Sequence, residues 1–256
     1  MPIWNAADYL RFETERTLPS RDLCAGIPLD KPQNILDVGC GPGNSTAVLR
    51  ERFKSARILG IDSSEEMIKS ARKSRPELDF RLLDAGKDLD KLDENYDVVF
   101  SNAVFQWIPD NKRLIKNLAA LIRPGGALAV QVPYNDKAEV VKALGRTVKS
   151  PDWAVKLEFA RKRHELTPQA YYDTLSKYFK TIRMWETAYY HILEKHEDFI
   201  DWYRGTSLRP YLQALSEQDQ TRFLGGLLSE IRQKYPARKD GKILFRFTRL
   251  FFIAQK

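Results

Sequence analysis

The chain has few of the residues that build disulfide frameworks, metal centres or membrane spans. It contains two cysteines and three histidines. Cys24 and Cys40 fit no disulfide or metal-binding spacing, and His164, His191 and His196 also lack the spacing of metal ligands. No apolar run reaches the ~20 residues that a transmembrane helix needs, and the first residues lack the basic-then-apolar pattern of a secretion signal. We therefore expect no metal, no membrane contact and a reducing, cytoplasmic setting.

Low-complexity segments, internal repeats and a basic tail are also missing from the sequence. The 42 Lys and Arg residues exceed the 34 Asp and Glu residues, and the resulting net charge of +8 is spread along the chain. Such a charge is consistent with a nucleic-acid partner, with attraction of a small acidic substrate, or with a solvated basic surface. At 256 residues the chain is long enough for one sizeable hydrophobic core.

One glycine-rich stretch dominates the first half of the chain. Residues 35–38 predict a buried strand, the run Gly-Cys-Gly-Pro-Gly occupies positions 39–43, and residues 44–53 have helical spacing. A strand, a glycine turn and a helix commonly hold a nucleotide-like ligand, because glycine permits tight turns and close approach of the ligand. The spacing departs from the dinucleotide fingerprint Gly-x-Gly-x-x-Gly, since Asn44 stands where a third glycine is needed. That departure, together with Asp37 in the strand, counts against NAD or FAD.

The next predicted strand, residues 57–62, ends at Asp62. Asp62 lies about 19 residues beyond Gly43, close to the ~20-residue distance at which an acidic residue meets ribose hydroxyls in such folds. A carboxylate accepts hydrogen bonds from both hydroxyls, which explains the residue type. Ser63 follows and residues 65–74 predict a helix, so this stretch is also consistent with a helix cap.

Two more strand ends carry polar residues. Residues 79–85 predict a third strand that ends near Asp84, which favours a ligand contact but is also consistent with a turn. Residues 96–102 predict a fourth strand that is apolar in its middle and ends at Ser101 and Asn102. Because open α/β sheets bind ligands at the carboxyl ends of parallel strands, these residues are candidates for one site.

The remaining elements complete an α/β pattern. A helix over 110–121 and a strand over 127–132 give a fifth strand–helix alternation, which predicts a parallel, doubly wound sheet. Beyond Pro133 the pattern changes, and we expect helices in 134–180, a strand over 182–192, helices in 196–238 and a strand over 242–254.

The run Leu-Asp-Val-Gly-Cys-Gly-Pro-Gly, residues 36–43, closely resembles the first motif of class I S-adenosylmethionine (SAM) methyltransferases. Over nearly its whole length the chain resembles the trans-aconitate 2-methyltransferase family. The residues that carry this resemblance are Trp4-Asn5, Tyr9, Phe12, Glu15-Arg16, residues 37–46 and 60–64, Gln106-Trp107, Pro109-Asp110, Tyr189-Tyr190-His191, Asp201-Trp202 and Leu208-Arg209-Pro210.

The resemblance implies a Rossmann-like fold with a mostly parallel seven-stranded sheet, helices on both faces and a helical cap. It divides the chain into an N-terminal helical lid (1–30), a SAM-binding core (31–133), a helical cap insertion (134–180) and a last part (181–256). That last part holds two sheet strands and, between them, a second cap segment (196–238).

In this family SAM methylates one carboxylate of a small unsaturated tricarboxylic acid and leaves S-adenosylhomocysteine. The resemblance implies that the glycines surround the methionine part, that Asp62 meets the ribose and that Asp84 with Ala85 neighbours the adenine. The expected cofactor-binding residues are Asp37, Gly39, Gly41, Gly43, Asp62, Ser63, Asp84, Ala85, Ser101 and Asn102.

A carboxylate acceptor has an ordinary pKa near ~4, so it is already ionised and needs no general base. We accordingly expect no catalytic acid–base residue. The acid's other carboxylates need cations and hydroxyls, among which the arginine fork is best suited. The candidates are Arg16, Tyr190, His191, Tyr203, Arg209 and Tyr211.

Three alternatives share the same cofactor loop. The acceptor could be another small molecule or a carrier-bound acyl carboxylate, or the chain could bind SAM without catalysis. A nucleic-acid methyltransferase is less favoured, because amino-methylating enzymes of that class carry Asn/Asp-Pro-Pro-Tyr/Phe after the fourth strand. Residues 101–105 are Ser-Asn-Ala-Val-Phe instead, and no Pro-Cys nucleophile is present.

Overall fold

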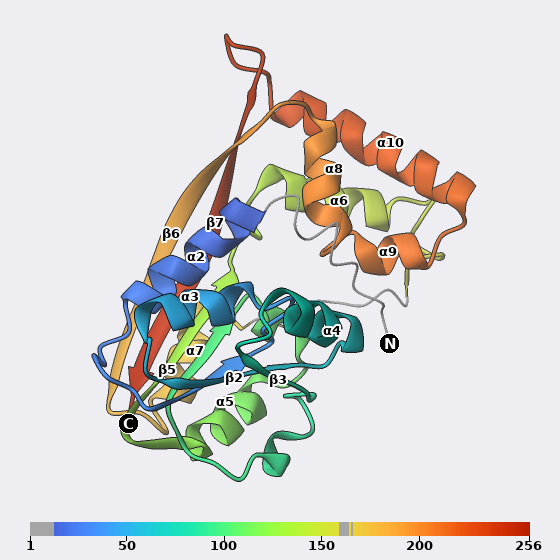
Figure 1. The fold of residues 1–256 in the computed structure, drawn as a ribbon. Helices are drawn as coiled ribbons and strands as arrows, with labels where there is room; N and C mark the ends of the chain where they lie inside the picture. Colours follow the sequence, from blue (N-terminus) through green and yellow to red (C-terminus); the bar gives the residue numbers. More distant parts are fainter. Residues whose placement is uncertain (1–12, 159–163, 165) are drawn as a thin grey trace.

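The computed structural model describes residues 13–158, 164 and 166–256, so residues 1–12 of the expected helical lid (1–30) lie outside the described residues. Its centre is a seven-stranded sheet with the order β3-β2-β1-β4-β5-β7-β6 (Figure 1). The strands are β1 (Asn34–Val38), β2 (Arg57–Asp62), β3 (Asp79–Leu82), β4 (Tyr96–Asn102), β5 (Ile122–Pro133), β6 (Thr181–Leu193) and β7 (Ile243–Gln255).

Strands β1 to β5 are parallel, and β7 runs antiparallel to both β5 and β6. The chain first winds outward from β1 to β3 and then returns to place β4 on the other side of β1. A crevice for ligands forms at such a switch point, outside the carboxyl ends of the strands. The Rossmann-like fold with its final antiparallel pair is confirmed.

Helices cover both faces of the sheet. On one face α2 (Glu13–Ala25) and α3 (Asn44–Arg52) bury Leu23 and Val48 against Val98 and Phe251. On the other face α5 (Asn111–Ala120) and α7 (Pro168–Leu175) contribute to a core that includes Phe252. Helix α4 (Glu65–Ser74) packs beside β2 and β3. Its N-cap is Ser64, whose hydroxyl accepts the backbone N–H of Met67.

The β6–β7 hairpin is longer than the sheet it joins. Residues 249–255 of β7 pair with β5, whereas residues 243–255 pair with β6, so one end of the hairpin extends beyond β5. Beside that end lie α6 (Glu139–Lys149), α8 (Glu197–Arg204), α9 (Arg209–Gln213) and α10 (Glu217–Lys234), which we call the cap (Figure 1). Aromatic residues of α8, α10 and β7, including Trp202, Phe223 and Phe245, form its core.

Two strand boundaries differ from the prediction. Strand β3 ends at Leu82 because the chain turns at Asp84, whose backbone oxygen accepts from the N–H groups of residues 87 and 88. Strand β5 starts at Ile122, earlier than expected, since its first residues pair with β4 across a register shift. The helices expected in 196–238 are α8, α9 and α10. Among the described residues, no helix is long and apolar enough to cross a membrane.

Candidate active site

A cavity of about 950 Å³ lies between the sheet and the cap. Its lining comes from the carboxyl ends of β1, β2, β4 and β5, the turn after β3, the segment after β4, and parts of α8 and β7. This volume is at the upper end of the range of roughly 300–1,000 Å³ that small-molecule sites occupy. The cavity is therefore large enough for a nucleoside-like cofactor together with a small second ligand.

The glycine loop after β1 forms one wall of the cavity. Gly39, Gly41 and Gly43 have φ angles of +71°, +55° and +94°, a left-handed conformation that favours glycine. A Cβ atom at Gly39 would lie 2.2 Å from a methyl group of Val104, whereas one at Gly41 would meet nothing within 4 Å. Gly39 and Gly41 line the cavity, and Gly43 lies at the start of α3 outside the lining.

Asp37 lies beneath this loop and does not line the cavity. Its side chain is fully buried, and Oδ2 accepts hydrogen bonds from the hydroxyls of Ser45 and Thr46 at 2.6 and 2.7 Å. Burial raises the pKa of Asp37 to about 6, while the two hydroxyl donors act in the opposite direction. The residue thus joins β1 to the first turn of α3 and supports the loop from below.

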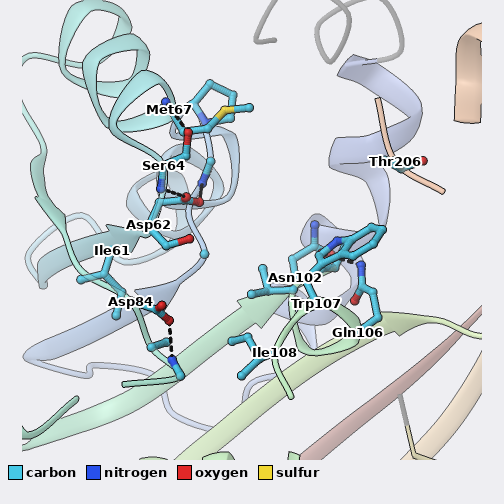
Figure 2. A pocket seen from close by; sticks show the side chains of 18 of the residues that line it. Ile61, Asp62, Ser64, Met67, Asp84, Asn102, Gln106, Trp107, Ile108 and Thr206 are labelled. Atoms are coloured by element: carbon cyan, nitrogen blue, oxygen red, sulfur yellow. Dashed lines mark hydrogen bonds between the residues drawn. The ribbon is translucent and has the colours of Figure 1, made fainter. Parts of the chain in front are cut away.

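Asp62, at the end of β2, faces the cavity (Figure 2). One carboxylate oxygen accepts the backbone N–H of Gly41 at 3.0 Å, and the other accepts that of Ser64 at 2.8 Å. Burial raises the pKa of Asp62, and these backbone donors oppose the rise because they favour the ionised form. Each oxygen has two lone pairs, so the carboxylate can hold the loop and still accept hydrogen bonds from a ligand.

Asp84 lies near Asp62 on the same wall of the cavity (Figure 2). Its Oδ1 accepts the backbone N–H of Gly86 at 2.8 Å, and its Oδ2 lies 3.5 Å from the Lys87 ammonium. Asp84 therefore both forms the turn and lines the cavity, so the two interpretations of this residue are compatible. Ser63 and Ala85 also line the cavity.

The segment after β4 forms the wall opposite Asp62, where Asn102, Gln106, Trp107 and Ile108 lie (Figure 2). Asn102 Oδ1 and Gln106 Oε1 have no hydrogen-bond partner within the described part of the chain. Between them, Ala103 has a φ of +60°, which strains a residue other than glycine. Ser101 is different, because its buried hydroxyl donates to the Val38 carbonyl at 3.0 Å and lies outside the lining.

These features fit SAM. Gly41 leaves open space beside the loop backbone, where a ligand can approach closely, and Asp62 offers acceptors for ribose hydroxyls. Asn102 Oδ1 is a buried acceptor that would suit an amino group. The individual roles of the ten expected cofactor residues stay predictions, and the structure brings seven of them into the lining of one cavity: Gly39, Gly41, Asp62, Ser63, Asp84, Ala85 and Asn102.

The part of the cavity nearest the cap combines polar and aromatic side chains. Asn135 Nδ2 donates to the hydroxyl oxygen of Tyr203 at 3.3 Å, and Asn135 Oδ1 accepts the backbone N–H of Thr248 at 3.2 Å. Asn135 and Tyr203 are both buried and both line the cavity. The same region includes Arg249 and the Trp202 ring.

The expected substrate-binding residues are dispersed. Tyr203 lines the cavity, and Tyr211 lines a second, apolar cavity of about 240 Å³ that shares Trp107, Tyr203 and Ser207 with the first. Arg209 begins α9, is half-buried and lies outside both linings. Arg16 belongs to α2, and its side chain lies outside the described part of the structure.

The two candidates on β6 lie outside the lining of the main cavity. Tyr190 is 60% exposed, and neither Tyr190 nor His191 belongs to the lining. His191 is buried with its ring centroid 4.5 Å from that of Trp202. Burial, aided by the positive charge of Arg249, lowers the pKa of His191 to about 4, so the ring is neutral at pH 7.

Sequence reasoning missed Arg249, Asn135 and Gln106. Arg249 carries a usable signal, because Phe245, Phe247 and Arg249 alternate along β7 and share one face of the strand. A charged residue on an otherwise apolar face of a strand indicates that its side chain is buried with that face. Asn135 and Gln106 carry no such pattern.

Comparison with solved structures supports the fold. The YcgJ protein of Bacillus subtilis is 15% identical with a TM-score of 0.59, covering 93% of this chain and 99% of its own. Phosphoethanolamine N-methyltransferase 2 of Haemonchus contortus, in complex with SAM, is 16% identical with a TM-score of 0.54, covering 94% of this chain and 52% of its own.

Sequence comparison identifies the family to which the chain belongs. A family model described as a methyltransferase domain matches residues 35–126. The trans-aconitate 2-methyltransferase of Azoarcus sp. is 42% identical over 255 residues, covering 99% of both chains. The trans-aconitate 2-methyltransferase of Rhodopseudomonas palustris is 40% identical over 259 residues, covering 100% of both chains. The chain therefore belongs to the trans-aconitate 2-methyltransferase family of SAM-dependent methyltransferases.

Proposed function

We propose that this protein is a cytoplasmic enzyme that methylates one carboxylate of trans-aconitate, forming a methyl ester and S-adenosylhomocysteine. One observation carries the proposal: a single cavity joins the glycine loop and Asp62 at one end to Asn135, Tyr203 and Arg249 at the other. The two relatives named above, which match over their full length, bear the name of this activity.

The cofactor would occupy the end of the cavity nearest the sheet. Gly39 and Gly41 would border the methionine part, and Asn102 Oδ1 would accept from its amino group. Asp62 would accept from the ribose hydroxyls and Asp84 from the adenine amino group. Asp37, Gly43 and Ser101 would act from beneath, by holding the loop and the strand ends in place.

When bound, SAM supplies a methyl group on a positively charged sulfur. The protein's own task is to hold an ionised carboxylate oxygen in line with the S–CH₃ bond, so that the O–C bond forms as that bond breaks and its electron pair stays on sulfur. The acceptor carboxyl has an ordinary pKa near ~4, so no side chain has to remove a proton. Positioning and exclusion of water would supply the catalysis.

The cap would close the acceptor end. Tyr203 and Asn135 place a hydroxyl and an amide in the lining, and Trp202 and Phe247 provide apolar walls beside them. We propose that the helical segments in 134–180 and 196–238 together form the substrate cap. Arg16, Arg209 and Tyr211 remain candidates for contacts made when the acid is bound.

The test is a product analysis with purified protein, SAM and a panel of di- and tricarboxylic acids that includes trans-aconitate. The expected result is a mass gain of one CH₂ group on trans-aconitate, reversed by mild alkali because the product is an ester. SAM binding without a mass gain on any acid would refute the substrate assignment and leave the cofactor assignment intact. Carrier-bound acyl carboxylates would then be the next acceptors to test.

A further inference from the structure

Arg249 is a charged side chain in the cavity wall, yet it is only 4% exposed. Burying a charge is costly unless the protein compensates for it. Arg249 NH1 donates to Oε1 of Gln131 at 3.3 Å, and the guanidinium carbon lies 4.8 Å from the centre of the Phe247 ring. These contacts hold the guanidinium in a fixed place, where β5 and β7 pair at the end of the sheet nearest the cap.

The other cations in the described lining have a different environment. Lys69, Lys87 and Arg113 are exposed residues of α4, the turn after β3 and α5, on the cofactor side of the cavity. Lys69 pairs with Glu65 at 2.8 Å, Lys87 lies 3.5 Å from Asp84, and Arg113 donates to the Gly86 carbonyl at 3.2 Å. Exposed ion pairs of this kind contribute little to binding. Among the described cations of the lining, Arg249 is the buried one.

Its surroundings favour recognition of an anion over a surface role. The Phe247 ring lies against the Arg249 guanidinium and Trp202 packs beside Phe247, and a charge-assisted hydrogen bond is stronger in such apolar surroundings than in water. A guanidinium presents a planar fork of donors that matches both oxygens of a carboxylate. Gln131 is completely buried, and its amide oxygen accepts the hydrogen bond from Arg249 NH1, so a fixed side chain contacts one arm of the fork.

We propose that Arg249 binds a carboxylate of the acceptor acid that is not methylated, and that Gln131 is the positioning residue that orients the Arg249 fork. This proposal rests on the proposed function. The non-reacting group is the better partner, because a bidentate guanidinium on the reacting carboxylate would withdraw electron density from the oxygen that must attack. Arg249 thereby selects acids with at least one spare carboxylate, and it fixes which carboxylate faces the methyl group.

The test compares R249Q and R249K with R246Q. Arg246 is a matched control, since it lies on the same strand but is exposed and pairs with Tyr190 across the hairpin. For R249Q we expect KM for trans-aconitate to rise at least about tenfold, with SAM affinity unchanged in calorimetry. The KM of R249K for trans-aconitate should lie between the values of wild type and R249Q, because lysine keeps the charge but lacks the planar fork of donors. R246Q should behave as wild type.

A second substrate separates recognition from general damage. Dicarboxylic analogues that each lack one carboxylate of trans-aconitate are assayed with wild type and R249Q. The analogue without the carboxylate that Arg249 binds should be a poor substrate for wild type and should lose no more than about twofold in kcat/KM on the R249Q substitution. Equal losses for trans-aconitate and every analogue would overturn the proposal, and so would an R249Q KM within about twofold of wild type.

Gln131 is tested through a cycle with Arg249. Q131L should raise KM for trans-aconitate with kcat and SAM affinity unchanged, and the double variant Q131L/R249Q should be no worse than R249Q alone. Additive losses would show that Gln131 acts independently of Arg249.

If wild type fails to methylate trans-aconitate, calorimetric binding of the acid itself still tests the anion site. Binding to wild type that is lost in R249Q would sustain the proposal although the proposed function had failed, and equal binding to both would overturn it.

Discussion

Asp62 is the residue from which the cofactor site can be tested most directly. Its two oxygens accept from Gly41 N–H at 3.0 Å and from Ser64 N–H at 2.8 Å, so it connects the glycine loop with the start of α4. We predict that Asp62→Ala weakens SAM binding at least tenfold, about 1.4 kcal/mol. The reason is that both ribose acceptors and both loop-holding hydrogen bonds disappear together.

The magnitude follows from the hydrogen bonds. A hydrogen bond to a charged group contributes about 1.5–3 kcal/mol, so loss of two ribose contacts corresponds to roughly 3 kcal/mol or more, which is about a hundredfold in affinity. The SAM affinity of Asp62→Asn should lie between those of Asp62→Ala and wild type. An amide has one acceptor oxygen, so it can keep either the Gly41 or the Ser64 hydrogen bond but turns an NH₂ group toward the other donor.

The assay is titration calorimetry of SAM into wild type, Asp62→Ala, Asp62→Asn and the control Glu65→Gln. Glu65 lies in the same cavity lining, but its side chain is 69% exposed and pairs with Lys69, so its substitution should change affinity by less than about twofold. A SAM analogue without the 2′-hydroxyl separates ribose contact from loop support. The affinity of wild type for this analogue should be lower than its affinity for SAM. Asp62→Ala should bind the analogue and SAM with the same affinity.

An unchanged SAM affinity in folded Asp62→Ala would refute this reasoning and remove Asp62 from the site. If the variant binds SAM weakly but still discriminates against the deoxy analogue, Asp62 supports the loop without touching the ribose. Circular dichroism and thermal unfolding without ligand establish that each variant is folded.

Four further predictions concern backbone geometry and buried titratable groups. Gly39→Ala should abolish SAM binding in calorimetry and lower the melting temperature, because its Cβ would lie 2.2 Å from a Val104 methyl group. Ala103→Gly should raise the free energy of unfolding in denaturant by about 1 kcal/mol, because it relieves a φ of +60°. The pKa of Asp37 is raised to about 6, so its contribution to stability is present below its ordinary value of 3.8 and lost as pH rises through 6. Wild type should therefore gain about 2 kcal/mol over Asp37→Asn as pH falls from 7 to 4, measured by denaturant unfolding. The pKa of His191 is lowered to about 4, so its contribution is present above 6.5 and lost as pH falls through 4, and His191→Phe should lack that acid-side loss in the same experiment.

The gathering of the expected cofactor residues at one edge of the sheet was predictable because its signals are local. The glycine turn, Asp62 and Asp84 each lie at or just beyond a strand end, and parallel strands bring their carboxyl ends to one edge of the sheet. The structure divides the expected cofactor residues into those that line the cavity and those that lie beneath it. Asp37 and Ser101 each lie one residue before the end of their strands, β1 and β4, yet their side chains turn inward and bond to α3 and β1.

The proposed acceptor side could not be predicted in this way, because its residues are distant in sequence. Asn135, Tyr203 and Arg249 come from the end of β5, from α8 and from β7, and only the long hairpin brings them to one cavity. Strand alternation places Tyr190 and His191 on opposite faces of β6, but it does not say what covers each face. In the structure one is exposed and the other lies behind Trp202.

The distribution of charge in the cavity suits both ligands of the proposed reaction. Carboxylates of Asp62 and Asp84 lie at the cofactor end and the buried Arg249 guanidinium at the acceptor end, so each end favours a ligand group of opposite sign. Methyl transfer joins a sulfonium cation to a carboxylate anion and leaves a neutral thioether and a neutral ester group. Because charge is lost on the way to the transition state, a site that excludes water favours the reaction more than water does. The loss of charge also weakens the attraction at the reacting centre, while any spare carboxylate on Arg249 keeps its own contact. Release of the ester should therefore depend on Arg249 more than release of S-adenosylhomocysteine does.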